Sequence, residues 1–375
     1  MIDIECVDRE DTFLGLKRDW GELWESSPTR SFFLTHDWIR SCWKELQASH
    51  ELRVFVVRES GKLVLCAPLM KSRRVQKRLR ADCLTFIEHP EAQTADILFS
   101  TSDQNSQPFV CFLQFLIKQR ATDWHLILLD KISEGSPTIR LLADAANSCM
   151  SRYEVKPSHA ALFIPLTNDW ETYLNSRSVR FRKTLRNVIN RIERLGALQV
   201  NCYKRSELTN SVIQKLFCIS DASWKVGDGV AMTSQRSRMT FFEDLLSDHQ
   251  GDVYVWLLEL NGTAIASEIQ VIDRTTVYAL RSDYDERYAD SSPGVYLQVE
   301  ILKRLFGSAY QQYNLGVGLN PYKTRWSDHR MSLQNFLLYN KTIYSRLLHS
   351  VDHCNGKLRQ VPALRTLQQF FLGGD

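Results

Sequence analysis

The stretch TTVYALRSDYDERYADSSPGVYLQVEILKRLFGSAYQQYNLGVGLNPYK, residues 275–323, decides the fold predicted for this chain. Its first part, Thr275–Tyr284, is rich in β-branched and aromatic residues, which predicts a strand. A helix with apolar residues every three or four positions begins at Pro293 and stops at Gly307. A second short strand, Tyr313–Val317, follows. The unit is therefore a strand, a turn, a helix and a strand.

The turn before this helix is the first candidate site. A helix start presents unpaired backbone N–H groups and the positive end of the helix dipole, a combination that suits an anion and above all a phosphate. The residues at that position are Ser291, Ser292, Pro293, Gly294 and Val295. The alternative is an ordinary capped helix without a ligand, since Ser-Pro is common at helix starts. The turn alone leaves both interpretations open.

Composition narrows the class of protein. The 375 residues suffice for about two domains, and 44% hydrophobic with 24% charged residues is typical of a soluble globular protein. A net charge of +4 does not indicate a strong polyanion binder, so DNA is not an expected partner. We find neither a membrane-length apolar run nor a signal peptide at the N-terminus. The nine cysteines form no CxxC pair, which favours a reducing compartment and hence the cytoplasm.

The first half of the chain alternates between strand and helix patterns, which predicts a mixed sheet with helices packed on it. A basic run, Lys71–Arg80, is expected to form a solvated strand or hairpin rim, with a phosphate or membrane-surface patch as the alternative. The expected elements are a strand at Ile2–Val7, a helix at Thr12–Ser26, a helix capped by Thr35, a hairpin of Leu52–Arg58 and Lys62–Leu69, a strand at Thr94–Phe99, a helix at Pro108–Arg120, a strand at Trp124–Leu129, a helix at Thr138–Ala146 and a strand at Ala160–Pro165.

The second half repeats this order of elements. We expect a long helix at Trp170–Leu195, a strand at Ala197–Tyr203, helices at Leu208–Trp224 and Thr233–His249, a hairpin of Gly251–Leu260 and Thr263–Asp273 around Asn261-Gly262, the opening stretch, a strand at Leu333–Tyr339, and a helical tail, Thr342–Leu372, interrupted at Gly356 and Pro362. The repetition predicts two similar α+β domains, at 1–166 and 167–345, followed by a helical tail at 346–375.

Two side-chain clusters carry weaker signals. The basic residues between Arg180 and Arg194 lie on one helix face, which is either solvated or in contact with an anionic acceptor. His349 and His353, four residues apart, stand near Cys354, but no fourth ligand is placed by the sequence, so no metal site is expected.

Several motifs, taken in order, resemble the GNAT-like acyltransferase domain of the CelD/BioF-like, FemAB-related group. They are RFRKTLRNVINRIERLG at 180–196, SSPGVYLQ at 291–298 and NLGVGLNPYK at 314–323, preceded in the first half by FFLTHDW at 32–38, CAPLM at 66–70 and the TADILF segment containing Asp96. The resemblance implies an α+β fold of two tandem GNAT-like domains, each a mixed, mostly antiparallel sheet flanked by helices. It also implies an N- or O-acyltransferase.

The resemblance further implies the donor. GNAT enzymes use acyl-coenzyme A as co-substrate, with its pyrophosphate on the helix start that here comprises Ser291 to Val295, and they hold no permanently bound cofactor. This sequence lacks the common Gln/Arg-x-x-Gly-x-Gly/Ala form of that loop. FemAB-type enzymes use aminoacyl-tRNA and usually carry a coiled-coil arm, for which no heptad run is visible here. A degenerate GNAT pair that acts as a binding or scaffold subunit is the third alternative.

Acyl transfer needs a base for the acceptor proton and stabilisation of the developing oxyanion. Glu268, in an otherwise apolar strand, is the candidate base, because a carboxylate in a partly dry cleft has a raised pKa. Tyr284 and Tyr322 are candidate catalytic residues, a tyrosine being able to protonate a leaving thiolate, and Lys323 could bind phosphate or stabilise an oxyanion. The alternatives are an outward-facing Glu268 and a surface Lys323.

Three further residues are expected to bind substrate: Tyr278, Arg281 and Trp224. Tyr278 could equally pack in the core. The family setting implies an acceptor with an amine or hydroxyl, such as a sugar, a lipid-linked sugar or a peptide, in exopolysaccharide or cell-envelope biosynthesis. It leaves open a peripheral contact with the membrane or an envelope-synthesis complex.

Overall fold

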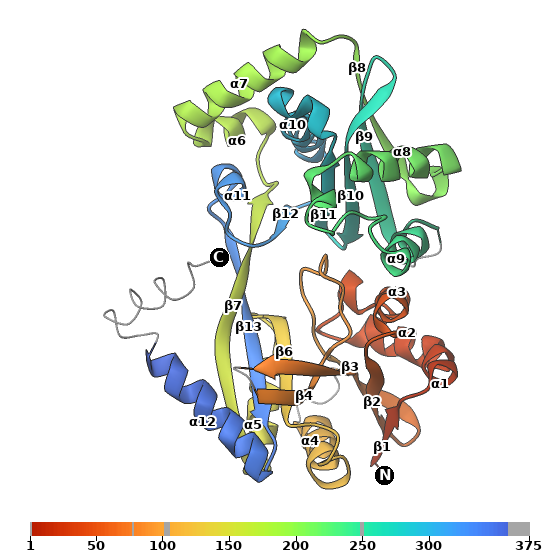
Figure 1. The fold of residues 1–375 in the computed structure, drawn as a ribbon, viewed down its shortest axis with the longest axis vertical. Helices are drawn as coiled ribbons and strands as arrows, with labels where there is room; N and C mark the ends of the chain where they lie inside the picture. Colours follow the sequence, from red (N-terminus) through yellow and green to blue (C-terminus); the bar gives the residue numbers. More distant parts are fainter. Residues whose placement is uncertain (1, 77–78, 101–105, 248–250, 359–375) are drawn as a thin grey trace.

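The computed structural model describes residues 2–76, 79–100, 106–247 and 251–358, and its strands form one continuous sheet (Figure 1). The sheet order is β1-β2-β3-β4-β6-β13-β7-β12-β11-β10-β9-β8, with β5 paired to β3. The first half comprises β1 (Ile2–Val7), α1 (Glu10–Gly15), α2 (Lys17–Ser26), α3 (His36–Leu46), β2 (Glu51–Glu59), β3 (Lys62–Gln76), β4 (Leu79–Phe86), β5 (Leu98–Phe99), α4 (Gln107–Gln119), β6 (Leu126–Ser133), α5 (Thr138–Ser148) and β7 (Arg152–Pro165).

The second half repeats the plan. It comprises α6 (Trp170–Ser176), α7 (Val179–Glu193), β8 (Leu198–Lys204), α8 (Asn210–Asp221), α9 (Arg236–Ser247), β9 (Asp252–Leu260), β10 (Thr263–Asp273), β11 (Thr276–Tyr284), α10 (Pro293–Leu305), β12 (Gln312–Val317), α11 (Pro321–Trp326), β13 (Arg330–Tyr339) and α12 (Ile343–Leu358). In each half four antiparallel strands are followed by one parallel pair, β4 with β6 and β11 with β12. The predicted α+β class is confirmed, with two similar, mixed and mostly antiparallel halves that belong to one continuous sheet.

The two halves share their central strands. β7 pairs with β13 along its first part and with β12 near its end, and β13 in turn pairs with β6. The strand predicted at Leu333–Tyr339 therefore lies within the sheet of the first half, although it comes late in the sequence. The domain boundary predicted at residue 166 falls just after β7, which ends at Pro165. Because one sheet continues through both halves, this boundary stays a prediction.

The structure corrects four predicted elements. The helix predicted at Thr12–Ser26 is divided at Leu16 into α1 and α2. The long helix at Trp170–Leu195 is two helices, because residues 177 and 178 are extended and the Ser178 side chain caps α7 by accepting from the Phe181 N–H. Of the strand predicted at Thr94–Phe99 only Leu98–Phe99 pairs with a neighbour. The tail helix α12 continues through Gly356 to Leu358, and the rest of the predicted tail, with Pro362, lies outside the described residues.

Helices α3 and α9 hold the two halves against each other. The Trp38 and Phe241 rings meet edge to face at 5.3 Å, and both belong to one apolar cluster drawn from both halves. The His89 ring, from the loop after β4, stacks on Phe241 at 3.8 Å. Lys44 on α3 pairs with Asp244 on α9 at 2.6 Å. These contacts hold the loop after β4 in place. In Figure 1 this loop lies below β10 and β11.

The basic run and the histidine cluster noted in the sequence are only partly covered by the described residues. The described residues of the basic run lie in β3, up to Gln76, and in β4, from Leu79, and Lys71 and Arg73 each lie 3.5 Å from Asp82. The side chains of His353 and Cys354 lie outside the described residues, and His349 lies 3.2 Å from Glu154. Within the described part of the chain, no cluster of possible metal ligands occurs and no helix is long and apolar enough to cross a membrane.

Asp96, in the TADILF segment, makes stability depend on pH. Burial raises the pKa of this carboxyl group to about 6, against hydrogen bonds from Ser136, Thr138 and the Ile97 N–H that lower it. Because this carboxyl group holds its proton more tightly in the folded state, it stabilises the fold at low pH. That contribution is lost as the pH rises from about 4 to about 6. We expect Asp96→Asn to be more stable than wild type above pH about 7, by up to about 3 kcal/mol.

Chemical denaturation of both proteins at acidic and at neutral pH measures this effect. The difference in unfolding free energy should grow with pH, whereas Asp228→Asn, at an exposed position, should show no such growth. An Asp96→Asn difference that is the same at both pH values would contradict the assignment.

Candidate active site

A cleft opens where the parallel strands β11 and β12 separate. They pair over only three positions, Thr276–Tyr278 against Gln312–Asn314, whereas β12 stays paired with β7 on its other edge as far as Val317. On its other edge β11 carries a bulge at Leu280, since Ala279 and Arg281 pair with consecutive residues of β10. The space between the separating strands has a volume of ≈ 600 Å³. Beyond these positions the two strands no longer pair with each other, and side chains bond some of their carbonyls, Ala279 from Gln93 and Val317 from Lys323.

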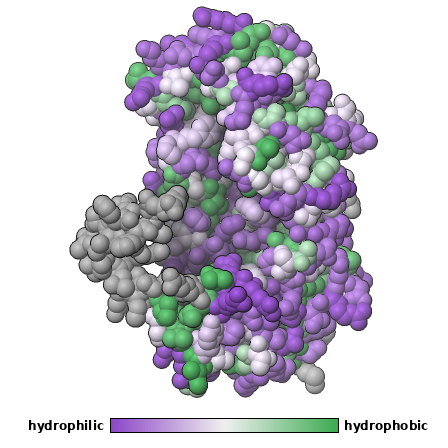
Figure 2. Space-filling view, viewed as in Figure 1, coloured by the Kyte–Doolittle hydropathy of each residue, from purple (hydrophilic) through white to green (hydrophobic). Residues whose placement is uncertain are grey.

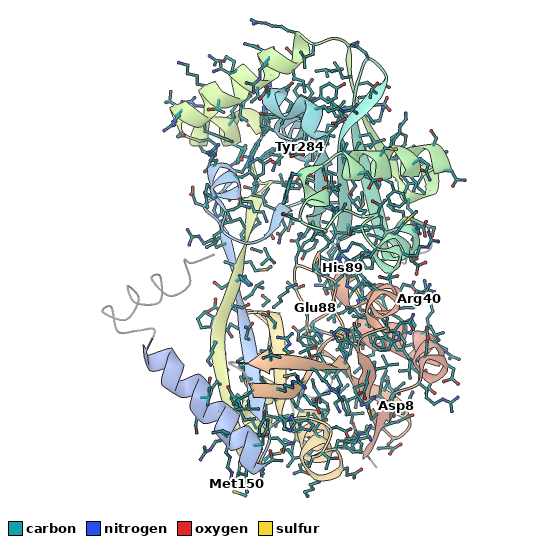
Figure 3. All side chains as sticks on the ribbon, in the orientation of Figure 1. Asp8, Arg40, Glu88, His89, Met150 and Tyr284 are labelled. Carbon is teal, nitrogen blue, oxygen red and sulfur yellow. The ribbon has the colours of Figure 1, made fainter. Side chains whose placement is uncertain are left out.

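Both halves of the chain line this cleft. Figure 2 shows a hollow at the level where the two halves meet, on an otherwise mainly hydrophilic face. In Figure 3, Tyr284 lies in the C-terminal half, above Glu88 and His89 at the boundary between the halves. The lining includes Pro90 to Gln93 from the first half and, from the second, residues of β10, β11, α10, β12 and α11.

The structure brings nine of the twelve predicted site residues to the cleft: Trp224, Glu268, Arg281, Tyr284, Ser292, Gly294, Val295, Tyr322 and Lys323. Three do not line it. Ser291 and Pro293 are buried under the helix start. Tyr278 packs against Phe33 at 5.2 Å, which is the core position that the sequence left open.

The start of α10 offers one free backbone donor. Ser292 adopts a left-handed conformation with φ 56°, its N–H donates to the Ala289 carbonyl, and the Val295 N–H donates back to the Ser292 carbonyl at 3.1 Å. Pro293 has no N–H. Among the described residues, the Gly294 N–H is therefore the one donor of residues 292–295 without an acceptor. Gly294 also leaves room, since a Cβ here would meet only the Tyr284 ring, at 3.6 Å.

A basic helix face lies beside this helix start. Arg191 on α7 donates from Nη2 to the Ser292 hydroxyl at 3.3 Å. Between residues 180 and 194 there are six basic side chains and one acidic one, most of them exposed: Arg180, Arg182, Lys183, Arg186, Arg191, Glu193 and Arg194. Positive potential therefore extends from the free Gly294 N–H across the surface.

Glu268 faces into the cleft and is 4% exposed, so the outward-facing alternative does not apply. Its Oε1 accepts from the Tyr313 hydroxyl at 2.7 Å and from Gln270 Nε2 at 2.6 Å, and its Oε2 accepts from the Ser282 hydroxyl at 3.0 Å. Gln270 is itself held by the Trp256 indole N–H at 2.9 Å. The carboxylate is therefore fixed in one orientation.

The environment of Glu268 suits proton transfer. Burial raises the pKa of its carboxyl group, although the three hydrogen bonds lower it in part. A carboxylate offers about four lone-pair sites, of which three donors occupy two on Oε1 and one on Oε2. Oε2 therefore keeps one site that can accept a proton from a ligand.

Tyr322 and Lys323 come from the start of α11, whose first turn is capped by the Asn320 side chain. Tyr322 is 41% exposed as a whole residue, and its hydroxyl donates to Gln298 on α10. Desolvation of that hydroxyl, together with the nearby Glu268 carboxylate, raises the pKa of this phenol. Lys323 is half-buried and donates from Nζ to the Val317 carbonyl at 2.8 Å. Burial lowers the pKa of its ammonium group, Lys225 adds to the effect and Glu91 opposes it.

Arg281 is fully engaged in holding the floor of the cleft. It donates to Asp283 at 2.8 Å, to Glu91 of the first half at 2.9 Å and to the Val230 carbonyl at 3.0 Å. Lys225 lies 2.6 Å from the other oxygen of Asp283. Burial alone would raise the pKa of Asp283, but Lys225 and Arg281 outweigh it, and the pKa is lowered.

Sequence reasoning missed four of these residues: Glu91, Gln93, Lys225 and Tyr313. Tyr313 is the first residue of the predicted strand Tyr313–Val317, so its position in the sheet could be predicted from the sequence. Glu91 and Gln93 stand almost 190 residues before their partners on β11, and no local pattern connects them.

Comparison with known proteins supports the class of fold. Residues 179–324 match the family model described as an acetyltransferase (GNAT) domain. None of the curated proteins searched matches the chain. Among solved structures the chain is similar to a conserved protein of unknown function from Bacteroides thetaiotaomicron, with a TM-score of 0.57 and 12% identity over 90% of this chain and 100% of that one.

It is also similar to FemX, with a TM-score of 0.53 and 12% identity over 85% of this chain and 95% of that one. A tandem GNAT protein from the clavulanic acid biosynthesis pathway matches with a TM-score of 0.50 and 11% identity over 90% of this chain and 98% of that one. At these identities the likeness concerns the fold, which is that of two GNAT-like domains.

Proposed function

We propose that this chain, whose residues 179–324 carry a GNAT domain, moves an acyl group from acyl-coenzyme A to an amine or hydroxyl acceptor. The observation that carries the proposal is the ≈ 600 Å³ cleft between the separating strands β11 and β12, with the free Gly294 N–H at its rim. The phosphates lie at the start of α10, near Arg191. The extended arm of the carrier runs between the two strands, where they no longer pair with each other.

The side chains fit the chemistry of acyl transfer. The acceptor nitrogen or oxygen attacks the thioester carbon and forms the new bond, and Glu268 Oε2 takes the acceptor proton. The C–S bond then breaks, and the Tyr322 hydroxyl protonates the leaving thiolate. The raised pKa keeps Tyr322 protonated until the thiolate forms. Because this phenol is a weaker acid than a thiol, the proton that Glu268 took must pass on to it to complete the transfer. Lys323 supplies positive charge beside the developing oxyanion.

Following the CelD/BioF-like resemblance, we propose that this reaction belongs to exopolysaccharide or cell-envelope biosynthesis in the cytoplasm, with a sugar, lipid-linked sugar or peptide as acceptor. Peripheral contact with the membrane or an envelope-synthesis complex belongs to the same proposal.

A second donor, aminoacyl-tRNA, is favoured by one observation. The exposed basic face of α7 is larger than a single coenzyme needs and begins beside the helix start at Arg191. Such a face suits a longer phosphate backbone, because each phosphate contact releases counterions.

Titration of the purified protein separates these functions. Acetyl-coenzyme A, a long-chain acyl-coenzyme A and charged tRNA are each titrated by calorimetry, the tRNA at two salt concentrations. Saturable binding of a coenzyme A thioester supports the proposal. Binding of charged tRNA alone would replace it with the second donor, and binding of none would leave a scaffold subunit.

A further inference from the structure

Gln93 is a buried side chain from the first half that lines the cleft of the second half. It is 2% exposed, and its Nε2 donates to the Ala279 carbonyl at 3.0 Å. Because a carbonyl can only accept, this bond fixes which end of the amide is nitrogen. Its Oε1 has no hydrogen-bond partner among the residues that the structure describes. A buried acceptor without a partner is costly and calls for an explanation.

Gln93 shares its position with Lys323. A Cβ placed on Gly316 would lie 3.2 Å from Lys323 Nζ and 3.6 Å from Gln93 Nε2, so both side chains border the same spot. Gly316 has φ 86°, and the absence of a side chain there keeps that spot open. Lys323 uses one of its three N–H bonds, toward the Val317 carbonyl. An unused cationic donor therefore stands beside the amide group of Gln93, whose oxygen has no partner.

This spot lies away from the helix start. Ala279, the partner of Gln93, comes five positions before Tyr284, which borders Gly294. Five residues of extended strand span roughly 17 Å. With the phosphates at Gly294, the Gln93 end of the cleft is where the carrier arm ends and the acceptor meets the acyl group.

The charges at the Gln93 end select one chemical class. A carboxylate would pair with Lys323 but has no hydrogen to donate to Gln93 Oε1, which would stay without a partner. An ammonium group would suit Gln93 Oε1 but meet the Lys323 cation. A neutral amide presents a carbonyl to Lys323 Nζ and an N–H to Gln93 Oε1, and so satisfies both groups.

We propose that Gln93 and Lys323 form an acceptor subsite that recognises a neutral amide next to the nucleophile, such as a peptide or an acetamido group. The first half of the chain thereby takes part in substrate selection. The assignment of this amide to the acceptor rests on the proposed acyl-transfer function, whereas the subsite itself rests on the side-chain geometry.

Three probes that differ at one group test the subsite in the full chain: β-alaninamide, β-alanine and n-propylamine. Saturation-transfer NMR measures their binding with and without acetyl-coenzyme A. We expect the amide to bind about tenfold more tightly than the other two, the effect of about one satisfied polar pair. In Gln93→Met this preference should disappear, while Gln114→Leu, at an exposed position of the same half, should retain it.

Equal binding of all three probes, tighter binding of β-alanine, or a preference that survives in Gln93→Met would overturn the subsite. If Gln93→Met does not fold, which its circular dichroism melting curve reports, the wild-type series alone decides. An amide preference without any binding of acetyl-coenzyme A would keep the subsite and reject the proposed donor, so the two failures are distinguishable.

Discussion

Replacing Gly294 by tryptophan is expected to weaken acetyl-coenzyme A binding by about two orders of magnitude or more. A side chain at this position projects toward the Tyr284 ring, which already stands 3.6 Å from the Cβ position. An indole would fill the rim of the cleft and cover the one free N–H at the start of α10. Calorimetric titration with acetyl-coenzyme A measures the loss directly.

The matched control is Gly15→Trp, because Gly15 is exposed and a Cβ there meets nothing within 4 Å. That variant should bind acetyl-coenzyme A as wild type does. Unchanged affinity in Gly294→Trp, with a wild-type melting temperature, would show that the donor does not use this helix start.

Replacing Glu268 by glutamine is expected to lower kcat by about 10²–10⁴-fold, the range for loss of a general base. Glutamine keeps the size of the side chain and can accept from Tyr313 and Gln270, so the network survives while the base is lost. The KM for acetyl-coenzyme A should change little. Because the pKa of Glu268 is raised, wild-type kcat/KM should rise with pH through an apparent pKa above that of an ordinary glutamate, and the variant should lack this rise.

Glu259→Gln provides the control, since Glu259 lies on the neighbouring strand β9, is also buried and pairs with Lys215 outside the cleft. It should keep full activity. A Glu268→Gln enzyme with unchanged kcat and the same pH profile would remove Glu268 from the chemistry and leave it as a structural residue.

Local patterns in the sequence predicted much of this architecture. Asn261 and Gly262 both have positive φ, as the predicted tight hairpin requires. Thr35 caps α3 by accepting from the Trp38 N–H, as predicted. The strand, turn, helix and strand from β11 to β12 were likewise predicted, because each depends on residues close in sequence.

The features that sequence did not reveal depend on long-range pairing. β13 inserts between β6 and β7, and its alternation of apolar residues says nothing about which strand it joins. The break before α7 depends on one serine cap inside a continuous apolar stripe. Gln93 reaches its position through the loop that His89 anchors on Phe241, a contact with no local signature. The candidate site was therefore predictable on β10, β11 and α10 and not on the facing half.

A crystal structure with coenzyme A tests the central claim most directly. We predict the pyrophosphate within hydrogen-bonding distance of the Gly294 N–H, the pantetheine arm between β11 and β12, and the thiol near Glu268 and Tyr322. Coenzyme A bound on another face, or an arm that runs outside the gap between β11 and β12, would contradict it.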